Sequence, residues 1–142
     1  HTGTDTGAAI TLTYNHPVKA LFWSGANSTA AKLQLNGHDR FSEQSHKYFT
    51  GVQPYECGLR HPISNTVDVS ASATGMYSFC LKPGEHQPSG SCNFSRIDNA
   101  RLVITTTAHG TGTTGESPLS VFALNYNVLR VMSGMGGLTY SN

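Results

Sequence analysis

The sequence predicts an all-β protein, folded as a β-sandwich or jelly roll. Short stretches with strand patterning recur along the chain, whereas apolar residues at helical spacing are nearly absent. Clusters of Gly, Pro, Asn and Ser separate these stretches and are typical of turns. Short strands joined by turns and long loops favour a sandwich over a βαβ fold. The 142 residues suit a single domain.

The first part of the chain predicts three strands. Ile10, Leu12 and Tyr14 alternate with polar residues and therefore share one face of the first strand. His16-Pro17 ends this strand, because the residue before a proline is restricted. Asn36-Gly37 closes the third strand as a tight turn. The three predicted strands are Ile10–Tyr14, Val18–Trp23 and Lys32–Leu35.

The middle of the chain departs from this pattern. Phe41–Tyr55 has apolar residues at rough helical spacing and predicts a short helix or an ordered loop. Ser42 is placed to cap a first turn that contains Glu43. Two further strands are predicted at Thr66–Ser70 and Met76–Leu81.

The second half of the chain alternates long connections with strands. Pro83–Ser95 is rich in proline, glycine and small polar residues and predicts a connection, as does the Gly/Thr-rich loop His109–Ser117. Between them, Ala100–Thr107 is a β-branched strand. Leu119–Val131 is apolar on both parities and predicts a central strand covered on both faces, by the partner sheet and by a neighbouring domain or subunit. Gly134–Gly137 predicts a turn with positive φ.

The composition favours self-association over nucleic-acid or membrane binding. Charged residues make up 12% of the chain, and the net charge is +1. This low charge does little to keep copies apart. The nine Lys and Arg residues form no basic stripe, so direct nucleic-acid binding is not expected. No apolar stretch approaches the ~18 residues that a membrane span requires.

The cysteines and the first residue bear on compartment and chain length. Cys57, Cys80 and Cys92 are odd in number and form no C-x-x-C pair, so we interpret them as reduced thiols, with Cys80 and Cys92 as the pair to check. The sequence opens at His1 without a charged and then apolar leader. We expect that either a leader has been removed or His1 continues from a longer parent.

No catalytic, cofactor-binding or metal site is predicted. His38-Asp39 and His46 lack the spacing of a zinc motif. Ser89–Cys92 is not a nucleophile elbow, because G-x-S-x-G is absent. The carboxylates are spread along the chain without a recognisable pair, and Gly134–Gly137 lacks the Lys-Ser/Thr of a phosphate loop. The sequence therefore predicts that the protein is not an enzyme.

Two asparagines lie in N-x-Ser/Thr triplets. Asn27 is in a predicted turn, and Asn93 is in the Pro83–Ser95 connection. Both are candidate glycan acceptors, if the protein meets a glycosylating compartment.

Two long motifs resemble a known family. Tyr77–Ala100 (YSFCLKPGEHQPSGSCNFSRIDNA) and Asn125–Asn142 (NYNVLRVMSGMGGLTYSN) resemble segments of the major capsid proteins of nucleocytoplasmic large DNA viruses, the phycodnavirus or chlorella-virus kind in particular. Three shorter pieces fit in the same order: Asn15–Lys19 leading to Trp23, then Leu35–Phe41, and then Tyr48-Phe49 with Gln53–Tyr55. The resemblance therefore spans nearly the whole chain.

The resemblance implies a fold and a role. Proteins of this family contain two consecutive jelly rolls and form trimers of pseudo-hexagonal outline that tile an icosahedral shell. Residues 1–142 are then expected to form most of the C-terminal jelly roll, without its first strand or so, and without the N-terminal jelly roll. The implied partners are other copies in a homotrimer, neighbouring capsomers and minor capsid proteins. The implied location is the virion, assembled in the host cell cytoplasm, and no cofactor is implied.

The connection within the first motif suggests a structural role. We expect Glu85–Asp98 to fold into a fixed, non-repetitive structure near a subunit boundary, with Glu85, Arg96 and Asp98 as a candidate brace through charge-assisted hydrogen bonds. An internal brace that touches no neighbour is the alternative, and the residues do not decide between them.

Two other functions remain open. A carbohydrate-binding sandwich would stack sugars on exposed aromatic rings, for which the candidates are Tyr14, Trp23, Tyr48 and Tyr55. A hydrolase on the same scaffold would need carboxylates or histidines that converge in one cleft. The exposure of those rings and the placement of those polar residues separate the alternatives, because fold alone does not.

Overall fold

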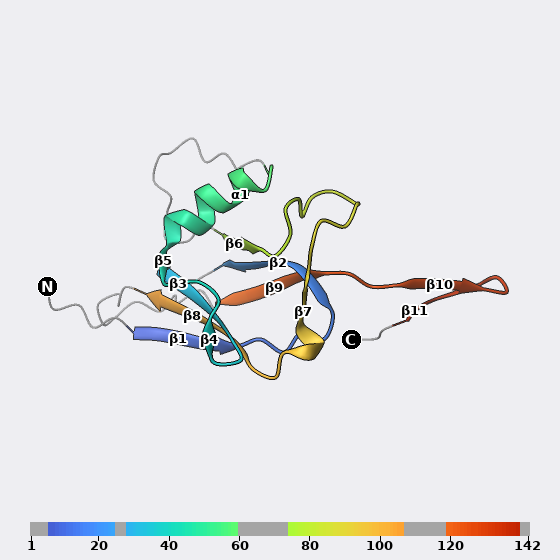
Figure 1. The fold of residues 1–142 in the computed structure, drawn as a ribbon, viewed down its shortest axis with the longest axis horizontal. Helices are drawn as coiled ribbons and strands as arrows, with labels where there is room; N and C mark the ends of the chain where they lie inside the picture. Colours follow the sequence, from blue (N-terminus) through green and yellow to red (C-terminus); the bar gives the residue numbers. More distant parts are fainter. Residues whose placement is uncertain (1–5, 25–27, 60–73, 107–118, 140–142) are drawn as a thin grey trace, which may run out of the picture.

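The computed structural model describes residues 6–24, 28–59, 74–106 and 119–139, which form a two-sheet β-sandwich with a long hairpin extending from one end (Figure 1). The predicted strand Thr66–Ser70, the predicted loop His109–Ser117 and Asn27 lie outside the described residues. The all-β prediction is confirmed for the part of the chain that is described.

The first sheet contains the β-branched strand and β1, which overlaps the predicted strand Ile10–Tyr14 only at Ile10 and Thr11, so that this prediction is wrong in its bounds. Its order is β1-β8-β3-β4, and the short β5 also pairs with β3. All of these pairings are antiparallel. The bounds are Thr6–Thr11 (β1), Ser28–Leu35 (β3), His38–Asp39 (β4), Gln44–Ser45 (β5) and Ala100–Thr106 (β8).

The second sheet is built around the apolar strand β2, which spans Pro17–Ser24. Val18 pairs with both Cys92 and Asn125, so β7 and β9 lie on opposite edges of β2. Ala20 likewise pairs with both Ser78 of β6 and Leu124 of β9, so β6 also lies on the edge of β2 opposite β9. The bounds are Gly75–Ser78 (β6), Cys92–Asn93 (β7) and Ser120–Asn125 (β9).

The core fills the space between these two sheets. Alternate residues of the strands point inward, as their period of two requires. The aromatic centre is Trp23, whose ring meets that of Phe49 edge-on at 5.1 Å between centroids. The largest fully buried core side chains are Val18, Leu21, Trp23, Leu33, Phe49, Leu102 and Ile104.

Gly75 is fixed by the packing of Trp23. The two residues are cross-strand partners in the β2–β6 pair. A Cβ at position 75 would lie 2.5 Å from Cε2 and Nε1 of the Trp23 indole. The indole therefore occupies the volume that any side chain at this position would need.

Turns and helical segments join the strands. Asn36 (φ 52°) and Gly37 (φ 81°) form the predicted turn, which leads from β3 to β4. The predicted helix is present but starts later, as a π-helical turn at Tyr48–Val52 followed by α1 at Gln53–Glu56. The expected cap at Ser42 is wrong, since Ser42 lies before these turns.

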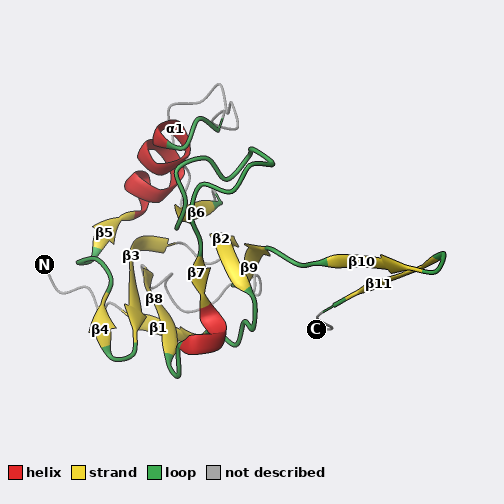
Figure 2. Cartoon of the chain, turned by 45° about the vertical axis from the view of Figure 1, so that its right-hand side comes forward, coloured by secondary structure: helices red, strands yellow, loops and turns green. Residues whose placement is uncertain are grey.

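The C-terminal apolar run is two strands rather than one. β9 ends at Asn125, and Tyr126–Val128 carries the chain to a hairpin of β10 (Leu129–Met132) and β11 (Met135–Leu138). The side chain of Asn127 accepts a hydrogen bond from the Val128 amide at 2.7 Å, a local bond that competes with strand pairing. Figures 1 and 2 show the hairpin reaching away from the sandwich. The prediction of one continuous strand at Leu119–Val131 is therefore wrong, and β9 pairs with β2 alone among the described strands.

The contact between Trp23 and Gly75 gives a test of the core. We expect Gly75→Ala to lower the free energy of unfolding by about 1–3 kcal/mol, because the new methyl group forces the indole out of its position. The control is Gly51→Ala, where a Cβ meets nothing within 4 Å in a helical segment and a gain of roughly 0.5–1 kcal/mol is expected. Urea denaturation of the protein measures both changes, and equal effects at the two positions would contradict this account of the core.

Candidate assembly surface

Exposed apolar side chains gather on the outer face of β9. Phe122 and Leu124 expose 62% and 43% of their surface, whereas Val121 and Ala123 on the other parity pack against the core. The strand is thus apolar on both faces, as the sequence predicts, but nothing in the described part of the chain covers the outer one. Exposed apolar side chains that adjoin one another make this face a candidate surface for contact with other protein.

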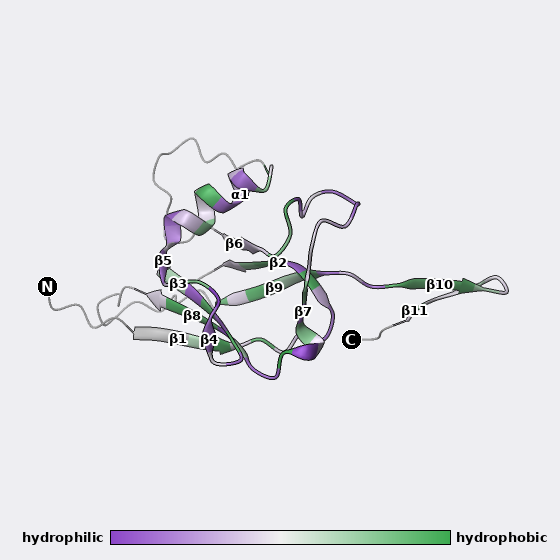
Figure 3. Ribbon diagram, viewed as in Figure 1, coloured by the Kyte–Doolittle hydropathy of each residue, from purple (hydrophilic) through white to green (hydrophobic). Residues whose placement is uncertain are grey.

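The hairpin continues this apolar surface away from the sandwich. Its register places Leu129 opposite Leu138 and Val131 opposite Gly136, so that one face carries aliphatic side chains and a glycine. The other face carries Met132 opposite Met135 and Arg130 opposite Gly137. The five apolar side chains of the two strands expose 55% to 75% of their surface. Figure 3 shows hydrophobic residues along β9 and β10.

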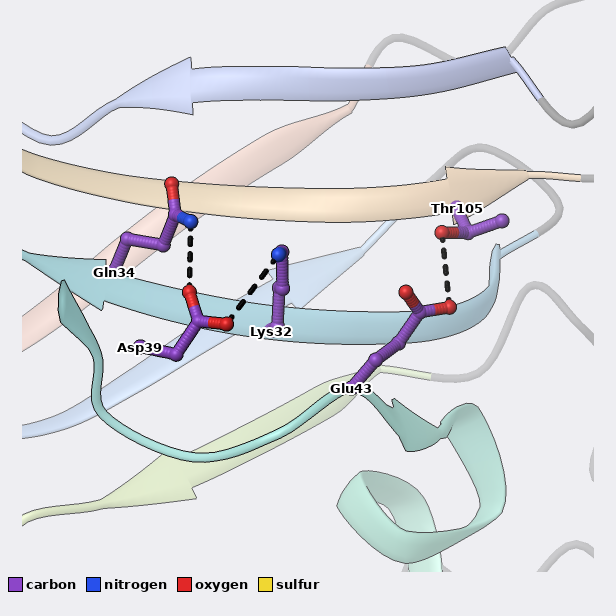
Figure 4. Close-up of polar contacts among 5 residues, drawn as sticks. All are labelled: Lys32, Gln34, Asp39, Glu43 and Thr105. Carbon is purple, nitrogen blue, oxygen red and sulfur yellow. Dashed lines mark hydrogen bonds and ion pairs between the residues drawn. The ribbon is translucent and has the colours of Figure 1, made fainter. Parts of the chain in front are cut away.

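The outer face of the first sheet is polar by contrast. Figure 4 shows Gln34 and Lys32 converging on the carboxylate of Asp39, at 2.7 Å and 3.5 Å. The hydrogen bond from Gln34, with help from Lys32, lowers the pKa of the Asp39 carboxyl. Nearby, the Thr105 hydroxyl donates to the Glu43 carboxylate at 3.3 Å. These exposed contacts contribute little to stability, and they leave charged and polar atoms at the surface of this face.

The connection between β6 and β8 is held by Lys19. This side chain is buried, with 8% of its surface exposed, and its ammonium donates to the carbonyl oxygen of Glu85 at 2.9 Å. The ammonium also lies 5.1 Å from the centre of the Tyr126 ring, an attraction that strengthens where water is excluded. Lys19 therefore ties the connection to the chain that follows β9.

The predicted brace residues do not come together. The Glu85 carboxylate pairs with Lys82 at 3.0 Å, and both side chains are largely exposed, so this ion pair contributes little. Arg96 ends a short 3-10 helix, and its side chain is exposed. Asp98 acts through its backbone amide, which donates to the Asn36 side chain. The structure thus places Glu85, Arg96 and Asp98 in one connection but not in one network.

Asn36 provides the bracing contact that the sequence did not reveal. Its Oδ1 accepts from the backbone amides of Asp98 and Asn99, at 3.0 Å and 3.2 Å. The Asn36 amide in turn donates to the carbonyl of Asn99 at 2.7 Å. The available signal was the Asn-Gly dipeptide, which predicts the turn but not a partner more than sixty residues away.

Of the two glycan candidates, Asn93 lies in the described residues. Its side chain is exposed and caps the 3-10 helix Phe94–Arg96, accepting from the Ser95 amide at 3.1 Å and the Ser95 hydroxyl at 2.6 Å. Its accessibility fits a modification site, although the side-chain oxygen already has a structural use.

The candidate acid, base and metal residues are dispersed. His38 is exposed in β4, whereas His46 is buried and shares a 2.7 Å hydrogen bond between its Nδ1 and the Ser28 hydroxyl. Within the four described ranges, no three His, Cys, Asp or Glu residues group closely enough to hold a metal ion. The cysteines are free thiols, and burial raises the pKa of Cys57 and Cys92. In the same ranges, no helix is long and apolar enough to cross a membrane.

The aromatic residues form no sugar-stacking platform. Trp23 is 1% exposed and belongs to the core. Tyr14 and Tyr48 are half-buried, with rings against Phe94 and Phe49. Tyr55 is exposed, but one ring among these four candidates is a weak basis for carbohydrate recognition.

The fold and this surface together define a class of protein. Successive major strands alternate between the two sheets, from β1 and β2 through β3 and β6 to β8 and β9, which is the arrangement of a jelly roll. One outer face is apolar and open to contact with further protein. The chain belongs to the large eukaryotic DNA virus major capsid protein family, whose model matches residues 24–137. This is a family of structural proteins.

Individual relatives support the assignment. The major capsid protein of Pyramimonas orientalis virus is 47% identical, with 94% of this chain and 39% of the relative covered. The major capsid protein of Chrysochromulina ericina virus is 52% identical, and the match covers 84% of this chain and 19% of that protein. Among solved structures, a quasi-atomic model of the PBCV-1 virus capsid is similar, with a TM-score of 0.73 and 33% sequence identity. The similar region covers 99% of this chain and 49% of the capsid chain. The jelly-roll prediction is confirmed, and the chain spans less than half the length of these relatives.

The two roles of Asn36 can be separated by substitution. Asn36→Gly keeps the positive φ but removes the acceptor for two amides, and we expect a loss of about 1 kcal/mol in the free energy of unfolding. Asn36→Ala removes the acceptor and also strains the backbone, which adds about 1–2 kcal/mol. Urea denaturation of the two variants measures the difference. Equal stability of Asn36→Ala and Asn36→Gly would show that the backbone at this position is not under the expected constraint.

Proposed function

We propose that this chain is the larger part of one jelly roll in a structural major capsid protein of an icosahedral double-stranded DNA virus. Trimers of the full-length protein, pseudo-hexagonal in outline, would tile the shell of the virion. The observation that carries this proposal is the match of residues 24–137 to a capsid protein family, on a chain whose β9 and hairpin expose apolar side chains that further protein would have to cover. A protein that functions alone in water would be expected to cover such a surface.

The proposal includes a longer parent polypeptide with a second, N-terminal jelly roll. Two observations support it. The chain corresponds to 39% of the Pyramimonas orientalis virus protein. In addition, β9 pairs along one edge with β2 and has no described strand on its other edge, and open edges are normally covered or blunted. A strand from the upstream polypeptide, antiparallel to β9, would complete the second sheet.

The remaining parts of the proposal concern partners and place. Partners would be two further copies in the homotrimer, neighbouring capsomers and minor capsid proteins, with assembly in the host cell cytoplasm. The few charges of the chain and its net charge of +1 support close contact between copies. The rival carbohydrate-binding function loses its support because Trp23 is buried.

The direct test is to image the full-length protein. We expect a native mass of three chains and, by electron microscopy, particles of pseudo-hexagonal outline that match capsomers of the source virus. A stable monomer at micromolar concentration would contradict the trimer. Mass spectrometry of the source particle tests the parent separately: a mature chain of these 142 residues alone would contradict a longer polypeptide.

Arg96 tests whether the Glu85–Asp98 connection lies at a subunit boundary. Its exposed side chain is available to a neighbour, and a charge-assisted hydrogen bond there contributes about 1.5–3 kcal/mol. We expect Arg96→Ala to reduce the yield of trimer roughly tenfold with little change in the unfolding of the single chain. The matched control is Arg101→Ala, an exposed arginine in β8. Unchanged trimer yield in Arg96→Ala would leave the connection as an internal brace.

A further inference from the structure

We propose that the β10–β11 hairpin is an interdomain clamp, whose aliphatic face packs on the upstream domain of its own polypeptide. This face is defined by Leu129, Val131, Gly136 and Leu138. The inference rests on the proposed function, since it requires a parent chain with an upstream domain. It goes further by assigning the hairpin to contacts within one chain rather than between copies.

The hairpin cannot owe its shape to its own contacts. It is a two-stranded ribbon joined by Ser133 (φ 51°) and Gly134 (φ 78°), and both of its faces are exposed. An isolated hairpin of this kind is at best marginally stable in water. With Leu129, Val131 and Leu138 each about two-thirds exposed, the ribbon needs a surface that buries them.

The two glycines of β11 indicate a close neighbour. Gly136 and Gly137 do not have positive φ, so the backbone does not demand glycine. A Cβ at Gly137 would meet nothing within 4 Å, and one at Gly136 would make an ordinary 3.9 Å contact with Val131. Glycine inside a strand weakens it and often marks the close approach of another backbone. At Gly136, the gap lies between aliphatic side chains of the clamp face, where a neighbouring segment would fit.

The direction of the strands identifies the occupant. β9 runs toward the hairpin, and β1 begins at the opposite end of the sandwich (Figure 1). Every described strand pair is antiparallel. A further strand that paired antiparallel with the open edge of β9 would run away from the hairpin and would end near the start of β1. The polypeptide that precedes this added strand therefore lies at the hairpin end of the sandwich.

The same conclusion follows from the position of the apolar surface. Phe122 and Leu124 on β9 and the aliphatic face of the hairpin are joined by the short segment Tyr126–Val128. Lys19 fixes the start of this segment through the Tyr126 ring, and the Tyr126 amide donates to the Pro17 carbonyl at 2.9 Å. The hairpin is thus attached to the sandwich at the point where the upstream domain would enter.

Photo-crosslinking in the assembled full-length protein tests the clamp. Val131 is replaced by p-benzoylphenylalanine, and the matched control carries the same replacement at Arg101, which is exposed on β8. We expect crosslinking at position 131 to leave a band of single-chain mass on a denaturing gel, with the crosslinked peptide derived from sequence upstream of His1. The control is expected to give no such peptide.

Other crosslinking outcomes overturn the clamp. A band of doubled mass at position 131 would assign the hairpin to a second copy, and a crosslink within residues 1–142 would place it on its own sandwich. The absence of any crosslink would show an unpartnered hairpin. The proposed capsid function is read separately from the native mass and the particle outline, so that a trimer with an intermolecular crosslink refutes the clamp alone.

A pair of glycine variants provides a second measurement. Gly136→Val adds a side chain to the clamp face, and Gly137→Val adds the same side chain to the opposite face. Valine suits a strand, and neither position is crowded within the chain. We expect Gly136→Val to reduce the yield of the crosslink at position 131 severalfold and to lower the melting temperature of the full-length protein. Gly137→Val is expected to leave both quantities close to those of the unsubstituted protein. Equal effects of the two variants, or none, would contradict a clamp through this face.

Discussion

The packing of Trp23 between the two sheets is the contact on which the other features depend. Its indole fills the space over Gly75 and meets Phe49 edge-on, which brings the helical segment after β5 onto the end of the core. Since β2 carries Trp23 and pairs with β6 on one side and β9 on the other, the indole sets the positions of three strands. A close-packed core of this kind tolerates little change in volume.

The two outer faces of the sandwich then diverge for electrostatic and hydrophobic reasons. The Gln34–Asp39–Lys32 contacts keep polar atoms at the surface of the first sheet. Water can hydrogen-bond there to the polar groups that have no protein partner. The second sheet presents Phe122 and Leu124 instead. Covering these side chains with protein would contribute a favourable free energy of roughly 25 cal/mol per Å² of apolar area buried. This difference in surface free energy gives the domain one face for solvent and one for protein.

Sequence patterns predicted the parts of this fold that local chemistry determines. The turn at Asn36-Gly37 follows from the tolerance of these residues for positive φ, and the strands at Val18–Trp23 and Ala100–Thr107 follow from apolar and β-branched runs within a residue or two of their observed ends. The roles of Lys19 and Asn36 could not be predicted, because their partners at Glu85 and Asp98 lie more than sixty residues away. The side chains of Glu85, Arg96 and Asp98 do not meet one another within the described residues, because nearness in sequence does not place charged side chains in contact, and their role at a subunit boundary stays a prediction.

The C-terminal run shows most clearly what periodicity reports. Residues that are apolar on both parities indicate that both faces of a segment are covered, but the pattern does not say by what, or whether the segment is continuous. The prediction of apolar faces on Leu119–Val131 was therefore compatible with a strand that breaks at Tyr126–Val128. Once the chain turns away from β2, its aliphatic side chains no longer complete the core of this sandwich. Because burial in contact with other apolar groups is what stabilises such side chains in water, the exposed aliphatic face of the hairpin is the reason for proposing that it packs on polypeptide outside these residues.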